Sequence, residues 1–320
     1  MRVGFACKYM GKDGKQPFPC RTVTASRLSM LTHDQQIEKL IEIGTHNVRA
    51  TISMIKMMAI RSETKRMVRI TSELLPLFTH KDFSVVSRKY VLPEVENQLR
   101  ALGEFARLHR VRLSFHPGQF TVLASDRPDV VENSIRDLEY HTRIATMMGY
   151  GKKFQDFKIN IHLSGKLGAQ GFRKNFLRLS PECRRMLTVE NDELTSHVDD
   201  CLTLSDLLPV VLDIHHHWVM TNEYIKPKSK TVNKVIDSWR GVRPTMHYSV
   251  SRPEFVPSDE FPDQNKLSVS KMKLRAHADY FHNQLVNEWA LSFDQFDIMC
   301  ESKAKNLAVV DLLKRQKNVL

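Results

Sequence analysis

Residues 186–213, MLTVENDELTSHVDDCLTLSDLLPVVLD, decide the fold class of this chain. The stretch contains two short apolar runs, Met186–Val189 and Val210–Ile214, and each run meets a carboxylate, Glu190 or Asp213. Short runs of β-branched and apolar residues between polar segments are typical of strands. The pattern therefore predicts two buried strands, each with an acidic side chain at its C-terminal end.

The same pattern recurs along the whole chain. Six further runs predict strands, at Val3–Cys7, Met67–Thr71, Val111–Phe115, Lys158–Ile161, Thr245–Tyr248 and Asp297–Cys300. Helical periodicity fills most of the gaps, as at Asp34–Ile43, Leu92–Leu108, Asp129–Met148, Ser268–Val286 and Ala304–Lys314. Eight strands that alternate with helices predict an α/β fold, the (β/α)8 or TIM barrel. We expect residues 1–320 to form this barrel as a single domain.

Most of the predicted strands are followed by a side chain that can bind a metal. These side chains are His80, His116, His162, Glu190, Asp213, His247 and Glu301. The C-terminal ends of the strands form the active site in such barrels. A lone histidine at a strand end more often packs than binds metal, but seven such positions at one face argue against packing alone. Nitrogen and oxygen donors without thiolate suit manganese, zinc or iron(II), and a set of this size predicts several ions close together.

Three consecutive histidines follow Asp213, at His215, His216 and His217. Side chains alternate along a strand, so Asp213 and His215 share one face until the strand ends. Beyond that point the alternation stops. Periodicity therefore does not decide which of the three histidines binds metal.

Length and composition fit a globular enzyme. The chain has 320 residues, of which 42% are hydrophobic, enough for a large core. No apolar run reaches about 18 residues, and the N-terminus does not resemble a signal peptide. We therefore expect an intracellular protein of the cytoplasm or nucleoid, neither secreted nor in a membrane. Five widely spaced cysteines fit free thiols in a reducing compartment.

The charge indicates a polyanionic partner. Lysine and arginine number 48 against 36 acidic residues, a formal net charge of +12. The basic residues cluster at Arg61–Arg69, Arg100–Arg112, Lys152–Lys158, Arg173–Arg185 and Lys226–Lys234. A surface of this sign attracts phosphates, and such binding weakens as salt rises. Solvated helix faces are the alternative explanation for these clusters.

Two irregular insertions, Met10–Arg27 and Ser249–Leu267, follow predicted strands on the presumed active face. Long loops at that face are candidate substrate-binding segments. Clustered divalent ions acidify water and neutralise phosphate, so a basic barrel with several metals favours phosphodiester hydrolysis. A metal-dependent sugar isomerase or epimerase needs fewer histidines and no positive surface. A barrel that binds nucleic acid without cutting is the alternative outside enzymes.

Several segments resemble the UV damage endonuclease family, a branch of the endonuclease IV-like and xylose isomerase-like barrels. They are Arg69–His80 (RITSELLPLFTH), Leu113–Phe120 (LSFHPGQF), Thr188–Asp192 (TVEND), Val211–Asp213 with the histidines that follow, His277–Tyr280 (HADY) and Asp297–Lys303 (DIMCESK). The resemblance runs from Val3 to about Ala308, with the motifs in the family's order.

The resemblance implies an enzyme that acts on double-stranded DNA, and we expect it to act as a monomer. Members nick DNA on the 5′ side of cyclobutane pyrimidine dimers and 6-4 photoproducts, and often of abasic sites. The products carry a 3′-hydroxyl and a 5′-phosphate. An endonuclease IV-like apurinic/apyrimidinic endonuclease is the alternative within this group.

The resemblance also implies a cluster of up to three divalent ions, commonly manganese, with zinc as the alternative. Glu190 would bridge two ions and, with His80 beside the cluster, would form the catalytic surroundings. The implied ligands are His116 and His162 for one ion, Asp213, His247 and Glu301 for the second, and His216 and His277 for the third. His216 is chosen because the family's ligand lies three residues after the aspartate.

Lesion recognition in the family implies side chains that probe the duplex while the damaged dinucleotide flips out. Gln119 and Phe120 fall on the probing pair, Phe5 falls where the family commonly has tyrosine, and Tyr9 is a nearby candidate. Packing at the barrel rim is the alternative for both phenylalanines. Thr245 stands where the family usually has a lysine near the metals. Threonine does not supply the positive charge of a lysine side chain, so this chain lacks that charge at position 245.

Overall fold

The structure is a closed barrel of eight parallel strands in sequence order. The computed structural model describes residues 1–317. The strands are β1 (Val3–Ala6), β2 (Met67–Arg69), β3 (Arg112–Phe115), β4 (Lys158–His162), β5 (Leu187–Glu190), β6 (Val210–Asp213), β7 (Thr245–Tyr248) and β8 (Asp297–Cys300). Each strand pairs with the next, and β8 pairs with β1. The barrel predicted from the sequence is confirmed, with strand ends shifted by two residues at most.

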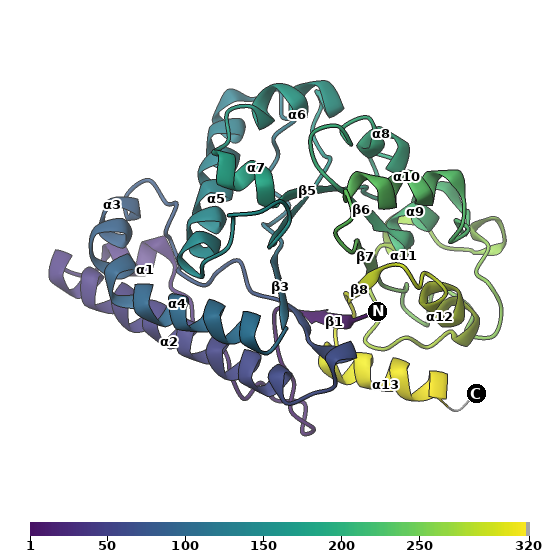
Figure 1. Cartoon of the computed structure of the whole chain (residues 1–320), viewed down its shortest axis with the longest axis horizontal. Helices are drawn as coiled ribbons and strands as arrows, with labels where there is room; N and C mark the ends of the chain where they lie inside the picture. The colour runs from purple at the N-terminus through teal and green to yellow at the C-terminus, as the bar shows by residue number, and fades with distance from the viewer. Residues whose placement is uncertain (318–320) are drawn as a thin grey trace.

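Helices surround the barrel (Figure 1). The longer helices are α2 (His33–Ala59), α4 (Leu92–Leu108), α5 (Pro128–Met147), α6 (Gly168–Phe176), α9 (Ile214–Thr221), α10 (Lys230–Ser238), α12 (Gln284–Leu291) and α13 (Asn306–Lys317). The shorter ones are α1 (Ala25–Ser29), α3 (Ser84–Val86), α7 (Pro181–Met186), α8 (Val198–Leu202), α11 (Lys271–Leu274), the π-helical turn η2 (Ser87–Val91) and the 3-10 turns η1 (Glu63–Lys65) and η3 (Gln264–Lys266). Among the described residues, no helix combines the length and apolar character that a membrane crossing needs.

Two predicted helices differ from the structure. Helix α2 starts at a capping box formed by Thr32 and Gln35 and continues to Ala59, well beyond the predicted end at Ile43. The single helix predicted over Ser268–Val286 is wrong, because α11 and α12 are separate. The intervening chain instead pairs with the segment after β7, through a bridge between Ser251 and His277. This tertiary pairing replaces helical hydrogen bonds and holds His277 near the strand ends.

A cluster of ion pairs between charged side chains lies at the N-terminal end of the barrel. Asp297, fully buried at the start of β8, accepts hydrogen bonds from Arg112 Nη1 at 2.8 Å and Arg243 Nε at 2.9 Å. The backbone N–H of Arg2 donates to the same carboxylate at 2.7 Å. Residues at this end of a barrel mainly serve stability.

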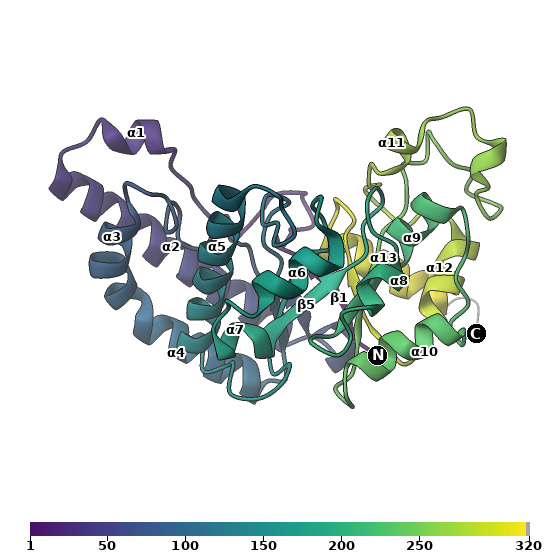
Figure 2. The same cartoon turned by 90° about the horizontal axis from the view of Figure 1, so that it is seen from above.

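Two segments extend beyond the barrel on one side. Figure 2 shows α1 and α11 at opposite ends of the molecule, both projecting in the same direction. The first segment follows β1 and the second follows β7, so both leave the barrel at the C-terminal ends of strands. They contain the two insertions of the sequence. We call residues 249–283 the β7 arm.

Candidate metal centre

The strand ends bring six of the predicted ligands together inside the barrel. His162 and Glu190 are register partners on β4 and β5, and Asp213 and His247 are partners on β6 and β7. His116 and Glu301 follow the ends of β3 and β8. Donor atoms lie within 4.8 Å of one another in three overlapping groups: His116, His162 and Glu190; Glu190, Asp213 and His247; and His116, His247 and Glu301.

Glu190 is the centre of this cluster. Its carboxylate is fully buried, with Oε1 2.9 Å from His247 Nδ1 and Oε2 3.2 Å from His116 Nε2. Asn160 Nδ2 also donates to Oε2. Burial alone would raise the pKa of Glu190, but His247 and the neighbouring histidines hold it well below its usual range. The two oxygens therefore present negative charge to different histidines.

Asp213 is positioned by the helix that follows it. As the N-cap of α9, it accepts the backbone N–H groups of His215 and His216 through Oδ1, each at 2.8 Å. Its Oδ2 is buried and has no hydrogen-bond partner among the described residues. Burial raises the pKa of Asp213 to about 7. A buried oxygen without a partner is costly, and a cation beside Glu190 would satisfy it.

Three histidine rings are oriented by backbone carbonyls. In each ring Nδ1 lies against a carbonyl oxygen: His116 at 3.0 Å from Pro117, His216 at 3.0 Å from Asn191 and His277 at 2.9 Å from Glu301. A carbonyl only accepts hydrogen bonds, so Nδ1 carries a proton, and in the neutral ring Nε2 keeps the lone pair that a metal would bind. This is the outer support that metal-binding histidines usually have. The nitrogen and oxygen donors of the cluster thus fit manganese or zinc.

Helix α9 separates the three consecutive histidines. It begins at Ile214, so these three residues lie on a helix that follows β6 directly. His215 Nε2 is 3.0 Å from Ser251 Oγ, whereas His216 Nδ1 is 3.7 Å from both Glu190 and Asp213. Burial would lower the pKa of His216, but Asp213 and its acidic neighbours raise it to about 9. The structure therefore places His216 among the carboxylates.

The sequence reading missed three polar side chains in the barrel interior. Arg69 forms an ion pair with Glu301, Asn160 bonds to Glu190, and Lys158 Nζ is 3.1 Å from His247 Nε2. Burial lowers the pKa of Lys158 to about 7. Strand alternation was the available signal, because residues 158 and 160 precede His162 by even steps on β4 and so share its face.

The predicted DNA-contacting residues divide into an exposed pair, Gln119 and Phe120, and a pair that is buried or half-buried, Phe5 and Tyr9. Gln119 and Phe120 lie on the loop after β3, and Phe120 is 82% exposed. Phe5 lies within β1, is 1% exposed and packs beside Tyr9, which favours the packing alternative; its contact with DNA stays a prediction. Tyr9 is half-buried, and its hydroxyl accepts a hydrogen bond from Arg61 at 2.9 Å.

His80 does not lie at a strand end. It stands on the loop after β2, eleven residues beyond Arg69. Its Nδ1 accepts from the backbone N–H of Asp82 at 3.3 Å, and its ring packs near Phe83. Within residues 1–317 no hydrogen bond or ion pair joins His80 to the metal ligands, so its catalytic role stays a prediction.

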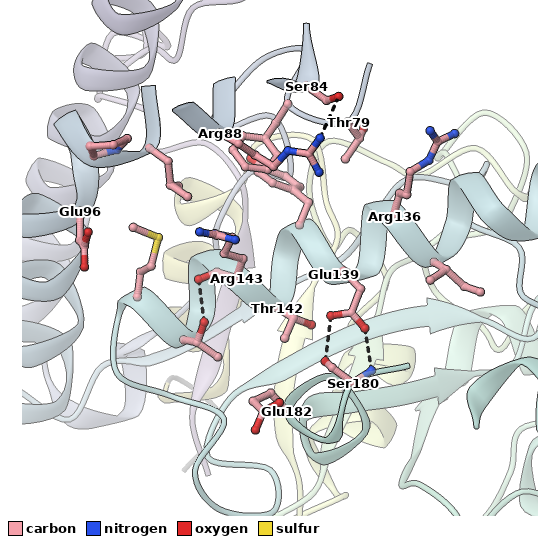
Figure 3. A pocket seen from close by; sticks show the side chains of 17 residues that line it. Thr79, Ser84, Arg88, Glu96, Arg136, Glu139, Thr142, Arg143, Ser180 and Glu182 are labelled. Carbon is pink, nitrogen blue, oxygen red and sulfur yellow. Dashed lines mark hydrogen bonds between the residues drawn. The ribbon is translucent and has the colours of Figure 1, made fainter. Parts of the chain in front are cut away.

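A separate cavity of about 710 Å³ lies outside the barrel, bordered by α4 and α5 (Figure 3). Arg88, Arg136 and Arg143 are among its lining residues. The carboxylate of Glu139 accepts from Ser180 N at 2.7 Å and from Ser180 Oγ at 2.8 Å. None of the predicted metal ligands lines this cavity, so it is distinct from the candidate centre.

The closed barrel and the cluster at its strand ends define a TIM-barrel protein with a candidate metal centre. The chain belongs to the family described as UV-endonuclease UvdE, whose model matches residues 1–319. Family membership makes it an enzyme, a DNA endonuclease of the UV-damage repair class. The resemblance noted in the sequence is confirmed.

Named relatives agree with this placement. The chain is 27% identical to a UV DNA damage endonuclease of Bacillus anthracis, over 94% of this chain and 90% of the relative. It is 30% identical to a UV-damage endonuclease of Schizosaccharomyces pombe, over 98% of this chain and 50% of that longer protein. The crystal structure of SacUVDE matches with a TM-score of 0.78 at 25% identity, over 100% of this chain and 99% of that one. Endonuclease IV of Thermus thermophilus shares the fold, with a TM-score of 0.56 at 14% identity, over 99% and 98% of the two chains.

Proposed function

We propose that this protein is a metal-dependent endonuclease that cuts the DNA backbone on the 5′ side of UV photoproducts. Its substrates are cyclobutane pyrimidine dimers and 6-4 photoproducts in double-stranded DNA, with abasic sites as a further substrate. The products carry a 3′-hydroxyl and a 5′-phosphate, and the enzyme acts as a monomer with one barrel domain. The observation that carries the proposal is buried, anionic Glu190 between His116 and His247 at the strand ends.

The centre would hold up to three divalent ions, manganese or zinc. Such ions supply Lewis acidity toward the phosphate and acidify water. Glu190 is suited to bridge two of them, because its two oxygens face different histidines. The ligands would be His116 and His162 for one ion, Asp213, His247 and Glu301 for the second, and His216 and His277 for the third.

The surrounding residues keep these donors in place. Asn160 donates to Glu190 from the same barrel interior, and Arg69 holds one oxygen of Glu301. The backbone N–H groups at the start of α9 fix one oxygen of Asp213 and leave the other free. Donors with preset orientation need little reorganisation when substrate phosphate arrives.

The exposed loop after β3 is suited to probe DNA. Phe120 presents a large apolar ring to solvent, and Gln119 beside it is also exposed. Aromatic side chains stack on unpaired bases, and damaged pairs unstack more cheaply than intact ones. The α1 segment and the β7 arm rise on the side to which the strand ends lead, so the duplex would lie between them (Figure 2).

An end-mapping assay tests the proposal. A duplex with one cyclobutane dimer, labelled at either end, is incubated with the protein and manganese or with a chelator. The expected product is a single manganese-dependent nick 5′ to the dimer whose 3′ end a polymerase extends. A matched duplex with one abasic site serves as the second arm. Cleavage of the abasic duplex alone would favour the endonuclease IV-like alternative.

A further inference from the structure

Glu193 lies beside the metal centre but belongs to none of the predicted ligand sets. It follows β5 on the same loop as Asn191, and its side chain is 13% exposed. Its Oε2 is 3.6 Å from His216 Nε2. Glu193 therefore adds a carboxylate to the side of the cluster where the third ion is expected.

The separation between Glu193 and His216 matches that of two ligands of one metal ion. His216 Nδ1 lies 3.0 Å from the Asn191 carbonyl, so in the neutral ring Nε2 presents a lone pair to the carboxylate. With a metal ion bound, this lone pair and the carboxylate oxygen would both point at the same cation. The 3.6 Å separation is too long for a direct hydrogen bond, which spans about 2.7–3.2 Å. Ligands at about 2.0–2.2 Å from one ion stand about 3.0–3.6 Å apart, so this separation fits a shared ion.

Arg275 orients the carboxylate of Glu193. Its Nε is 2.5 Å from Oε1, so this oxygen is engaged and Oε2 is the one that faces His216. Arg275 is part of the β7 arm, two residues before His277. His277 Nδ1 is held by the Glu301 carbonyl, which leaves its Nε2 available. The arm therefore carries one implied ligand and the group that positions another.

We infer that Glu193 is a third protein ligand of the ion that His216 and His277 hold, with Arg275 as its positioning residue. The inference rests on the proposed metal centre. The site joins the loop after β5, helix α9 and the β7 arm, so the third ion fastens the arm to the barrel. Binding of the third ion should therefore reduce the mobility of the β7 arm.

Manganese binding to the full chain tests the inference. Chelator-stripped wild type, Glu193→Gln, Arg275→Gln and the control Glu260→Gln are titrated with Mn²⁺, and bound metal is counted after gel filtration. Glu260 is exposed, lies on the same arm and forms no side-chain hydrogen bond or ion pair in the described structure. Loss of an outer partner weakens metal binding about 10–100-fold. We expect about that loss at the third site for Arg275→Gln, at least about 100-fold for Glu193→Gln, and no change for Glu260→Gln.

Limited proteolysis supplies a readout that is independent of activity. Mn²⁺ should slow cleavage within the β7 arm in wild type and in Glu260→Gln but not in Glu193→Gln. Three ions bound with unchanged affinity by both Glu193→Gln and Arg275→Gln would overturn the inference and leave the metal centre standing. A wild-type protein that binds no ions would instead contradict the centre itself. Equal thermal unfolding temperatures of the metal-free wild type and variants verify that each variant folds. If Glu193→Gln does not fold, Arg275→Gln alone provides the test.

Discussion

Lys158 Nζ lies 3.1 Å from His247 Nε2 in the barrel interior. The lysine that the family resemblance places two residues before His247 is replaced by Thr245, which is buried and whose hydroxyl has no partner within the described residues. Lys158 comes from β4, whereas His247 is on β7. The chain thus supplies an amine to this histidine from a different strand.

Replacing Lys158 by methionine should weaken metal binding at the site that contains His247. Burial lowers the pKa of Lys158 to about 7, and its neutral amine accepts the Nε2–H of His247; loss of such a partner costs about 10–100-fold in metal affinity. Mn²⁺ titration of the stripped protein measures the change, with exposed Lys153→Met as the control. Equal affinity in wild type and Lys158→Met would show that the amine does not support His247.

The Glu190→Gln variant should lose at least about 100-fold in nicking, because a bridging carboxylate contributes more than an outer partner. The substitution keeps the size of the side chain, so the circular dichroism spectrum should match that of wild type. The same outcome is expected for His116→Ala and Asp213→Ala. Near-full nicking by Glu190→Gln would remove the proposed bridging role.

Phe120→Ala should weaken binding to damaged duplex by about 1–3 kcal/mol, the contribution of one base–aromatic stack. Metal content should not change, because the Phe120 side chain is 82% exposed and has no atom that binds a metal ion. Fluorescence anisotropy with dimer-containing and intact duplex measures the difference. Leu177→Ala, another exposed apolar position, is the control. An equal loss for both duplexes would argue against lesion probing.

Asp297→Asn should destabilise the protein by about 1–3 kcal/mol at pH 7, because the buried carboxylate is the shared hydrogen-bond partner of the partly exposed Arg2, Arg112 and Arg243. Burial would raise the pKa of Asp297, but Arg112 and its neighbours hold it below the ordinary 3.8. The folded state then binds this proton less readily than the unfolded state. The ion pairs of Asp297 therefore contribute their full stabilisation to the folded state above about pH 4, and this contribution is lost as the pH falls further.

Guanidinium chloride unfolding at pH 7 measures the loss of stability. Acid unfolding followed by circular dichroism measures its pH dependence. The variant should show a shallower loss of stability below pH 4 than wild type. Asp294→Asn, an exposed neighbour, should behave as wild type. Identical acid profiles for wild type and Asp297→Asn would contradict the stabilising role of this cluster.

The sequence predicted the barrel well because parallel strands buried on both faces read as short apolar runs. Met186–Val189 differs from β5 by one residue at each end. The helix over Ser268–Val286 failed because a backbone bridge to Ser251 competes with helix formation there. The burial of Phe5 was not predictable, because position relative to a strand end does not tell whether a ring faces the surrounding helices or solvent.

The candidate site was predictable only in part, because some of its contacts depend on how distant segments fold together. His116, His162 and Glu190 meet because strand ends of a barrel converge, which follows from topology alone. Glu193 and Arg275 are 82 residues apart and meet only because the β7 arm folds back over the loop after β5. Lys158 and Asn160 share a face with His162, but alternation does not show which histidine or carboxylate they reach across the barrel.

The most direct test of the proposed function is nicking of supercoiled plasmid, irradiated or unirradiated, with manganese or with a chelator. We expect manganese-dependent nicks confined to irradiated DNA, placed 5′ to dipyrimidines. Equal nicking of irradiated and unirradiated plasmid, or none with any divalent metal, would contradict the proposal.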